Sequence, residues 1–119
     1  MNELLFNFNC NYKSEYEIVL GDTLENLLNF ESNKYDLIIT SPPYNVGKEY
    51  ETKQSIEKYL ARQEEVIKQL IRVTSTKGNI CWQVGNYVKN GEVFPLDIFY
   101  YQIFKKYNLK LCLGLNILL

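Results

Sequence analysis

The sequence contains no histidine and only three cysteines among its 119 residues. Without histidine, a Ser-His-Asp triad, a histidine general base and a histidine-ligated metal are all excluded. The cysteines, Cys10, Cys81 and Cys112, are odd in number, lie far apart and form no CxxC pair. Neither a disulfide framework nor a zinc site is therefore expected, and we predict no metal site.

Long hydrophobic runs are also missing from the sequence. No apolar stretch approaches the roughly 20 residues that span a bilayer, and the first residues do not form a basic start followed by an apolar segment. We therefore expect a cytoplasmic protein without a membrane partner. The composition, which is 46% hydrophobic and 14% aromatic, is typical of a packed globular chain.

The formal net charge is only −1, but the charges are unevenly distributed. Residues 1–39 contain 2 lysines and 7 acidic residues, whereas residues 40–119 contain 11 basic and 7 acidic residues. The basic excess begins next to residues 41–44 and would help to hold a phosphate backbone there. A chance fluctuation explains the gradient equally well.

The hydrophobic pattern predicts strands and helices in alternation. Strands are expected over residues 17–20, 35–40, 79–85 and from 108 to about 113, and helices over 23–30, 55–77 and 95–106. Thr23 and Ser55 are the expected N-caps, residues 86–91 an expected loop, and the inward side chains of the last helix are expected to be Ile98, Phe99, Ile103 and Phe104. The 35–40 segment is apolar enough for a strand that is buried on both faces. Helices that connect buried strands indicate an α/β fold with a mainly parallel sheet and flanking helices.

The Ser41-Pro42-Pro43-Tyr44 tetrapeptide follows the 35–40 strand directly. Open parallel sheets bind ligands beyond the carboxyl ends of their strands, and two prolines make this turn rigid. The Ser41 hydroxyl and the Pro42 carbonyl are acceptors that would draw the amino nitrogen of a nucleobase toward a tetrahedral shape. Tyr44 offers an aromatic face to a base that has left the duplex. The alternative is a proline-stiffened turn in which Tyr44 is only a packing residue.

Three segments of the sequence resemble a known family. Residues 21–25 (GDTLE), 36–50 (DLIITSPPYNVGKEY) and 78–87 (GNICWQVGNY) are similar to the amino-terminal part of adenine-N6 and cytosine-N4 DNA methyltransferases. The resemblance covers roughly residues 17–110. It implies a partial Rossmann-like methyltransferase fold, DNA as the partner and S-adenosylmethionine as the methyl donor.

The resemblance also implies roles for individual residues. Ser41, Pro42, Pro43 and Tyr44 match the catalytic tetrapeptide of the family. Asp22 matches a position that contacts the adenosyl part of the cofactor, and Asn45 and Lys48 lie on the loop beside the target base. The alternatives are a turn or cap residue for Asp22 and a plain solvated loop for Asn45 and Lys48.

The target base is indicated only by the first residue of the motif. Serine at this position, here Ser41, is found in family members that act on cytosine N4 more than in those that act on adenine N6. Methylation at carbon 5 of cytosine is disfavoured, since it needs a cysteine nucleophile that usually follows a proline. None of the three cysteines follows a proline.

The resemblance does not extend to the rest of the cofactor site. The family continues into a target-recognition region and an FxGxG-type strand end that holds the methionine part of the cofactor, and the 119 residues contain neither. We expect an arm over residues 1–16, a partial catalytic domain over 17–110 and an atypical tail over 111–119. Truncation or a frameshift would explain that tail. The alternative is that the chain is one subunit of a split enzyme, whose second chain provides the missing parts. The chain alone is expected to be inactive, and to be marginally stable, to associate with itself or to bind a second chain.

Two other classes of function remain open from the sequence. One is a non-enzymatic module that binds nucleic acid, whose salt-dependent binding would survive replacement of Ser41 and Tyr44. The other is an amino-methyltransferase that acts on RNA or protein, since similar tetrapeptides serve other amine and amide targets.

Overall fold

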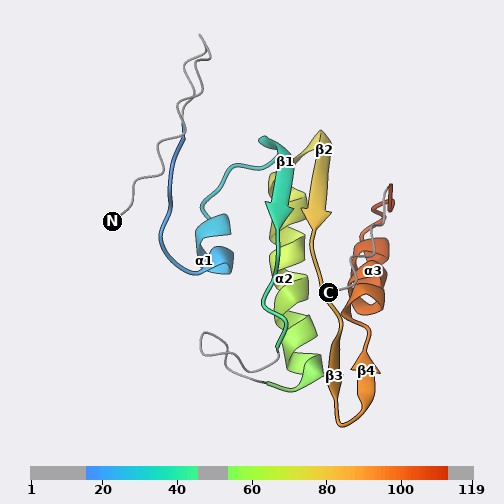
Figure 1. The fold of residues 1–119 in the computed structure, drawn as a ribbon. Helices are drawn as coiled ribbons and strands as arrows, with labels where there is room; N and C mark the ends of the chain where they lie inside the picture. Colours follow the sequence, from blue (N-terminus) through green and yellow to red (C-terminus); the bar gives the residue numbers. More distant parts are fainter. Residues whose placement is uncertain (1–15, 46–53, 113–119) are drawn as a thin grey trace, which may run out of the picture.

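A parallel pair of strands lies at the centre of the fold and packs on a long helix (Figure 1). The computed structural model describes residues 16–45 and 54–112. In these ranges the elements are α1 (Thr23–Leu27), β1 (Tyr35–Thr40), α2 (Ile56–Val73), β2 (Thr74–Trp82), β3 (Tyr87–Lys89), β4 (Glu92–Phe94) and α3 (Leu96–Lys106). None of these helices has the length and apolarity needed to cross a bilayer.

The parallel pairing of β1 with β2 confirms the predicted α/β class. Ile38 is opposite Ile80 and Thr40 is opposite Trp82, and the register shifts between Tyr35 and Leu37. Gly78 lies at this irregularity, where a Cβ atom would be 2.6 Å from Thr74 Cγ2 and 2.9 Å from the Tyr35 carbonyl oxygen. Only glycine fits there, because the backbone of β1 cannot move away without breaking the ladder.

The helices cover one face of the β1–β2 pair. Leu27 of α1 and Leu70 and Val73 of α2 form a buried cluster, against which Ile38 and Ile80 of the strands pack. On the opposite face, Leu37 is 56% exposed and Ile39 is 73% exposed. The expectation that residues 35–40 are buried on both faces is therefore wrong for the described chain, since its helices all lie on the other side.

A second buried cluster joins α2 to α3. It consists of Tyr59, Ile67, Leu96 and Tyr100, and the partly buried side chains packed on it include Trp82, Phe99, Ile103 and Phe104. Of the side chains expected to point inward from α3, only Ile98 does not, being 52% exposed. Leu96 and Tyr100 lie in the core instead, on the same helical stripe as Ile103.

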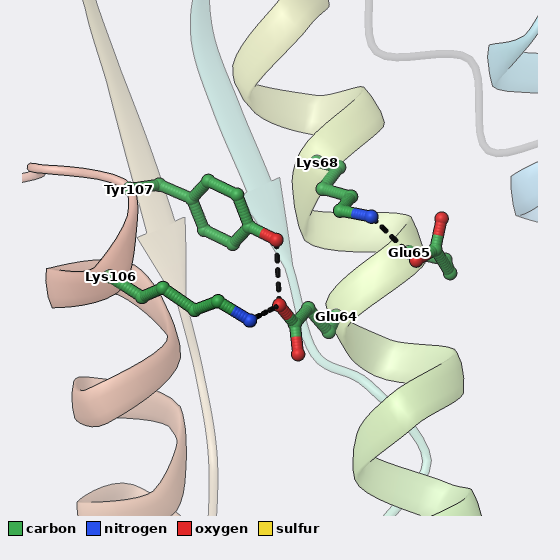
Figure 2. Close-up of polar contacts among 5 residues, drawn as sticks. All are labelled: Glu64, Glu65, Lys68, Lys106 and Tyr107. Carbon is green, nitrogen blue, oxygen red and sulfur yellow. Dashed lines mark hydrogen bonds and ion pairs between the residues drawn. The ribbon is translucent and has the colours of Figure 1, made fainter.

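The end of α3 is also fixed to α2 by polar contacts. Lys106 Nζ and the Tyr107 hydroxyl both bind Glu64 Oε1, each at 2.6 Å (Figure 2). These contacts hold the pKa of Glu64 below its usual range, first through the hydrogen bond from Lys106 and then through that from Tyr107. They also raise the pKa of Lys106 and of Tyr107, because Glu64 accepts a hydrogen bond from each.

The long helix and α1 begin and end at slightly different residues from those predicted. Ser55 caps α2 as expected, with its Oγ accepting from Lys58 N at 3.3 Å. However, α2 ends at Val73 and β2 begins at Thr74, five residues earlier than the strand predicted from residue 79. Thr74 and its neighbours favour extended structure, which outweighs continued helix. At α1 the cap is Asp22, not Thr23, and the helix ends at Leu27.

Three other segments differ from the predicted structure. Residues 17–20 form no strand: Ile18 and Leu20 are 90% and 97% exposed and pair with no strand of the described residues. The predicted loop over 86–91 belongs to the β3–β4 hairpin, whose turn places Asn90 and Gly91 at positive φ (54° and 78°). Residues 108–112 form no strand either. Residues 1–15 of the expected arm, residues 113–119 of the expected tail and Lys48 lie outside the described residues.

Candidate functional site

The tetrapeptide predicted to be functional lies directly beyond the carboxyl end of β1. The hydrogen bonding to the neighbouring segment extends to this point, since Gln83 N donates to the Thr40 carbonyl at 2.9 Å. In the turn itself Pro42 is buried, whereas Ser41 is exposed. The sheet and the buried proline therefore fix the start of the turn and leave the Ser41 hydroxyl accessible.

Tyr44 returns to Ser41 at the other end of the turn. Ser41 Oγ and the Tyr44 hydroxyl are 3.2 Å apart, and either group can be the donor. The Tyr44 ring is half-buried and lies next to Gly85, where a Cβ atom would be 3.4 Å from Tyr44 Cε2. The ring therefore packs beside Gly85, at a distance where a Cβ atom would be in ordinary van der Waals contact. The turn thus brings a hydroxyl group and an aromatic ring together.

Two buried tyrosines lie on the core side of the turn, and one of them contacts it directly. The Tyr59 hydroxyl donates to the Pro43 carbonyl at 2.5 Å and lies 2.5 Å from the Tyr100 hydroxyl. Tyr59 is 1% exposed and Tyr100 is 2% exposed. Burial, and then the hydrogen bond with Tyr59, raises the pKa of Tyr100 far above its ordinary value, so that its hydroxyl remains protonated.

Sequence reasoning missed the polar role of both tyrosines. The hydrophobic pattern predicted the two helices that carry Tyr59 and Tyr100 but pointed to neither hydroxyl. A usable signal was present, since a tyrosine on a buried stripe needs a partner for its hydroxyl. The identity of that partner, Pro43, depends on the tertiary fold and leaves no local pattern.

Asn45, the residue after the turn, is hydrogen-bonded to Gln54. Its Nδ2 donates to the Gln54 carbonyl at 2.8 Å, and Gln54 N donates to its Oδ1 at 3.0 Å. Asn45 is 5% exposed and has a φ of 60°, a left-handed conformation that asparagine tolerates better than most residues. Its amide therefore joins the two ends of residues 46–53, the segment that contains Lys48 and lies outside the described residues.

Asp22, the predicted cofactor contact, has a structural role in this fold. Its Oδ1 accepts from Glu25 N at 3.2 Å as the N-cap of α1, and its Oδ2 lies 2.7 Å from Arg62 NH2. The backbone hydrogen bond from Glu25 and the positive charge of Arg62 lower the pKa of Asp22. Its two oxygens offer more lone pairs than these contacts use, so the carboxylate can also accept from a ligand hydroxyl or amino group.

The sequence of the chain matches known DNA methylases. Residues 35–112 match the profile of the N6/N4 methyltransferase family, described as DNA methylase. The chain is 44% identical over 90 residues to the type II methyltransferase M.BglII of Bacillus subtilis. The aligned segment covers 75% of this chain and 25% of that protein. It is 45% identical over 65 residues to the type II methyltransferase M.ScaI of Streptomyces caespitosus, or 55% of this chain and 21% of that protein.

The fold matches a solved structure in the same way. TTHA0409 of Thermus thermophilus, which is assigned as a DNA modification methylase, superposes with a TM-score of 0.64 at 27% identity. The match covers 73% of this chain and 38% of that one. This chain therefore spans about a quarter of the length of the curated relatives and under half of the structural one.

Proposed function

Because the chain belongs to the N6/N4 family of DNA methylases, we propose that its Ser41–Tyr44 turn receives the exocyclic amino group that is to be methylated. The observation that carries this proposal is the contact of 3.2 Å between Ser41 Oγ and the Tyr44 hydroxyl at the carboxyl end of β1. An acceptor and a stacking surface meet there on a turn that Pro42 and Pro43 stiffen. A base that leaves the duplex needs both.

The turn activates the amino group through hydrogen-bond acceptors. When Ser41 donates its own proton to Tyr44, both lone pairs of Ser41 Oγ are available to a base. The amino group of the base then donates one N–H to Ser41 Oγ and the other to the Pro42 carbonyl. This draws the nitrogen toward a tetrahedral shape and localises its lone pair for attack. After transfer the nitrogen is positively charged and acidic enough to lose a proton to water, so no histidine is needed.

S-adenosylmethionine, when bound, supplies an electrophilic methyl group on a sulfonium centre. Among the residues that the structure describes, we assign Asp22 to its site, as an acceptor for the adenosyl part. The fit is partial, because this carboxylate is already engaged with Glu25 and Arg62 and makes one edge of a site rather than a cradle. We propose that polypeptide additional to these 119 residues completes it, since M.BglII is about four times as long as the matched segment.

DNA is the proposed substrate, and cytosine N4 is favoured over adenine N6 by Ser41. The excess of basic residues in 40–119 supports contact with the phosphate backbone near the turn. The chain alone is proposed to transfer no methyl group. It is proposed to act with a second polypeptide, and self-association through the uncovered face of Leu37 and Ile39 is the alternative.

Complementation tests this function. The 119-residue chain is mixed with the part of M.BglII that it does not match, with DNA and with a methyl donor that carries a radioactive methyl group. Label is expected in DNA only when both polypeptides are present, and base analysis should find it on cytosine N4. Replacing Ser41 or Tyr44 by alanine should abolish it, whereas Tyr101→Ala, at an exposed site on α3, should not. Labelling by the unmodified chain alone would contradict the proposal. Labelling by the Tyr44→Ala chain together with the M.BglII part would contradict it as well.

A further inference from the structure

We propose that Tyr59 and Tyr100 are positioning residues that set the direction of the acceptors in the Ser41–Tyr44 turn. The inference rests on the proposed function of that turn. It begins from a chain of hydroxyl groups that runs from α3 through α2 to the Pro43 carbonyl, with 2.5 Å between successive oxygens. The three groups come from parts of the sequence that are far apart.

The direction of the hydrogen bonds follows from counting protons. Tyr59 has one hydroxyl proton, which it donates to the Pro43 carbonyl. Tyr100 must therefore donate to Tyr59. A hydroxyl that accepts a hydrogen bond is polarised into a better donor, so Tyr100 strengthens the contact between Tyr59 and Pro43. Both hydroxyls belong to side chains that are almost fully buried, which leaves little space for water to replace either one.

The bond to Pro43 determines where the neighbouring Pro42 carbonyl points. The proline rings fix φ at both residues, so two rotations remain: ψ of Pro42, which turns the Pro42 carbonyl, and ψ of Pro43, which turns the Pro43 carbonyl. The hydrogen bond from Tyr59 holds the Pro43 carbonyl and with it the far side of the Pro42 rotation, and the buried ring of Pro42 holds the near side. The Pro42 carbonyl between them is therefore held in one direction.

The same bond distinguishes the carbonyls of the turn. Tyr59 occupies one lone pair of the Pro43 oxygen, on the side of the core. The Pro42 carbonyl and the Ser41 hydroxyl then remain the acceptors for an incoming amino group. If Tyr59 were only a packing residue, it would stabilise the fold without affecting which oxygens of the turn accept from the amino group.

The test compares Tyr59→Phe with the unmodified 119-residue chain and with the control Tyr101→Phe, which removes an exposed hydroxyl from α3. Phenylalanine keeps the buried ring and removes only the donor. Nuclear magnetic resonance follows the carbonyl carbon of Pro43 and the side chains of Ser41 and Tyr44. Competition with a fluorescein-labelled oligonucleotide follows binding of an oligothymidine that contains one cytosine, whose N4 amino group can donate to the acceptors of the turn. The oligothymidine without the cytosine is the reference.

We expect Tyr59→Phe to shift all three resonances and to reduce the preference for the cytosine-containing oligonucleotide about five- to tenfold, the effect of one hydrogen bond to the amino group. Tyr101→Phe should match the unmodified chain in both measurements. If the Ser41 and Tyr44 resonances do not move in Tyr59→Phe, or if they move while this preference is unchanged, the positioning role is wrong.

Two further results separate this inference from a failure of the proposed function. If the unmodified chain does not prefer the cytosine-containing oligonucleotide to the oligothymidine, the proposed function fails, and the resonances of Ser41 and Tyr44 alone decide whether Tyr59 sets the turn. If Tyr59→Phe does not fold, Tyr100→Phe replaces it, because that variant leaves the donor to Pro43 in place and removes only its polarising partner. Smaller shifts in the same direction support the inference, and unchanged resonances overturn it.

Discussion

The hydroxyl oxygens of Ser41 and Tyr44 lie 3.2 Å apart, across a turn of two prolines. This contact gives Tyr44 two separable roles. Its ring offers a stacking face to a base, and its hydroxyl can accept the proton of Ser41, which leaves the lone pairs of Ser41 for the amino group. A variant that keeps the ring and removes the hydroxyl separates the two roles.

Tyr44→Phe should retain base binding and reduce methyl transfer. The ring remains for stacking, but the hydroxyl of Ser41 loses its partner and can turn its own proton toward the base. In the complemented reaction with the unmatched part of M.BglII, we expect transfer to fall roughly three- to tenfold, the effect of one hydrogen bond. The affinity for an unpaired 2-aminopurine, a fluorescent analogue of adenine without the 6-amino group, should stay within about twofold of that of the unmodified chain. Stacking on the ring dominates this affinity. Equal transfer by both chains would show that the hydroxyl does not orient Ser41.

The elements that follow strong local patterns were predictable from the sequence. The β1 strand agrees with its predicted bounds because an apolar run is closed by two prolines, and Ser55 was recognisable as the cap of an amphipathic helix. The β3–β4 hairpin was missed although Asn90-Gly91 is a strong turn signal. Its strands of three residues are too short to show alternation.

Only the part of the site that is contiguous in the sequence could be predicted. Ser41 and Tyr44 belong to one motif, so their proximity follows from the sequence. The contact of Tyr59 with Pro43 and that of Tyr100 with Tyr59 depend on how two helices pack beside the turn, which no local pattern contains. The two hydrogen bonds between Asn45 and Gln54 join residues that are nine positions apart, and the sequence predicted only a loop position for Asn45.

Asn45→Ala should destabilise the chain more than Asn45→Gly. Both variants remove the two hydrogen bonds to Gln54, but alanine must also adopt a φ of 60°, which glycine does easily. We expect a loss of about 2–3 kcal/mol for alanine and about 1–2 kcal/mol for glycine in the free energy of unfolding. Urea denaturation followed by circular dichroism measures both. Equal losses would mean that the left-handed backbone carries no cost at this position.

Arg72→Lys should destabilise the connection between α1 and β1. The guanidinium of Arg72 donates to the Leu27 and Phe30 carbonyls at 2.7 and 2.8 Å and to Ser32 Oγ at 2.9 Å. A lysine ammonium cannot reproduce this planar array, so we expect a loss of about 1–3 kcal/mol in the free energy of unfolding.

Arg62→Lys is the matched control for this substitution. Arg62 makes an ion pair with Asp22 in which both side chains are more than a third exposed, so the change should stay within about 1 kcal/mol. Thermal denaturation in parallel distinguishes the two variants. A larger effect for Arg62→Lys than for Arg72→Lys would contradict the role given to Arg72.

The contact between α2 and α3 should weaken in acid. The hydrogen bonds from Lys106 and Tyr107 hold the pKa of Glu64 below its ordinary value of 4.5. A carboxyl whose pKa is lower in the folded state stabilises the fold above its unfolded pKa, and this contribution is lost as the pH falls through the folded pKa. The melting temperature should therefore decrease below about pH 4.5, and less steeply in Glu64→Gln.

Glu65→Gln is the control for this pH dependence. Glu65 pairs with Lys68 one turn along the same helix, whereas Glu64 reaches across to α3 (Figure 2). The Glu65→Gln variant should keep most of the acid sensitivity of the unmodified chain. If Glu64→Gln has the same slope as the unmodified chain, the contact with Lys106 and Tyr107 does not contribute to stability in the way described.

The most direct test of the central claim is fluorescence titration of 2-aminopurine, placed unpaired in an oligonucleotide, with the 119-residue chain. A base that stacks on Tyr44 should be quenched, and Tyr44→Ala should weaken binding about 5- to 150-fold, the loss of one stack. The control Tyr101→Ala, at an exposed site, should bind as the unmodified chain does. Binding that depends on salt but is unchanged in Tyr44→Ala would contradict the claim and indicate a non-enzymatic nucleic-acid-binding module instead.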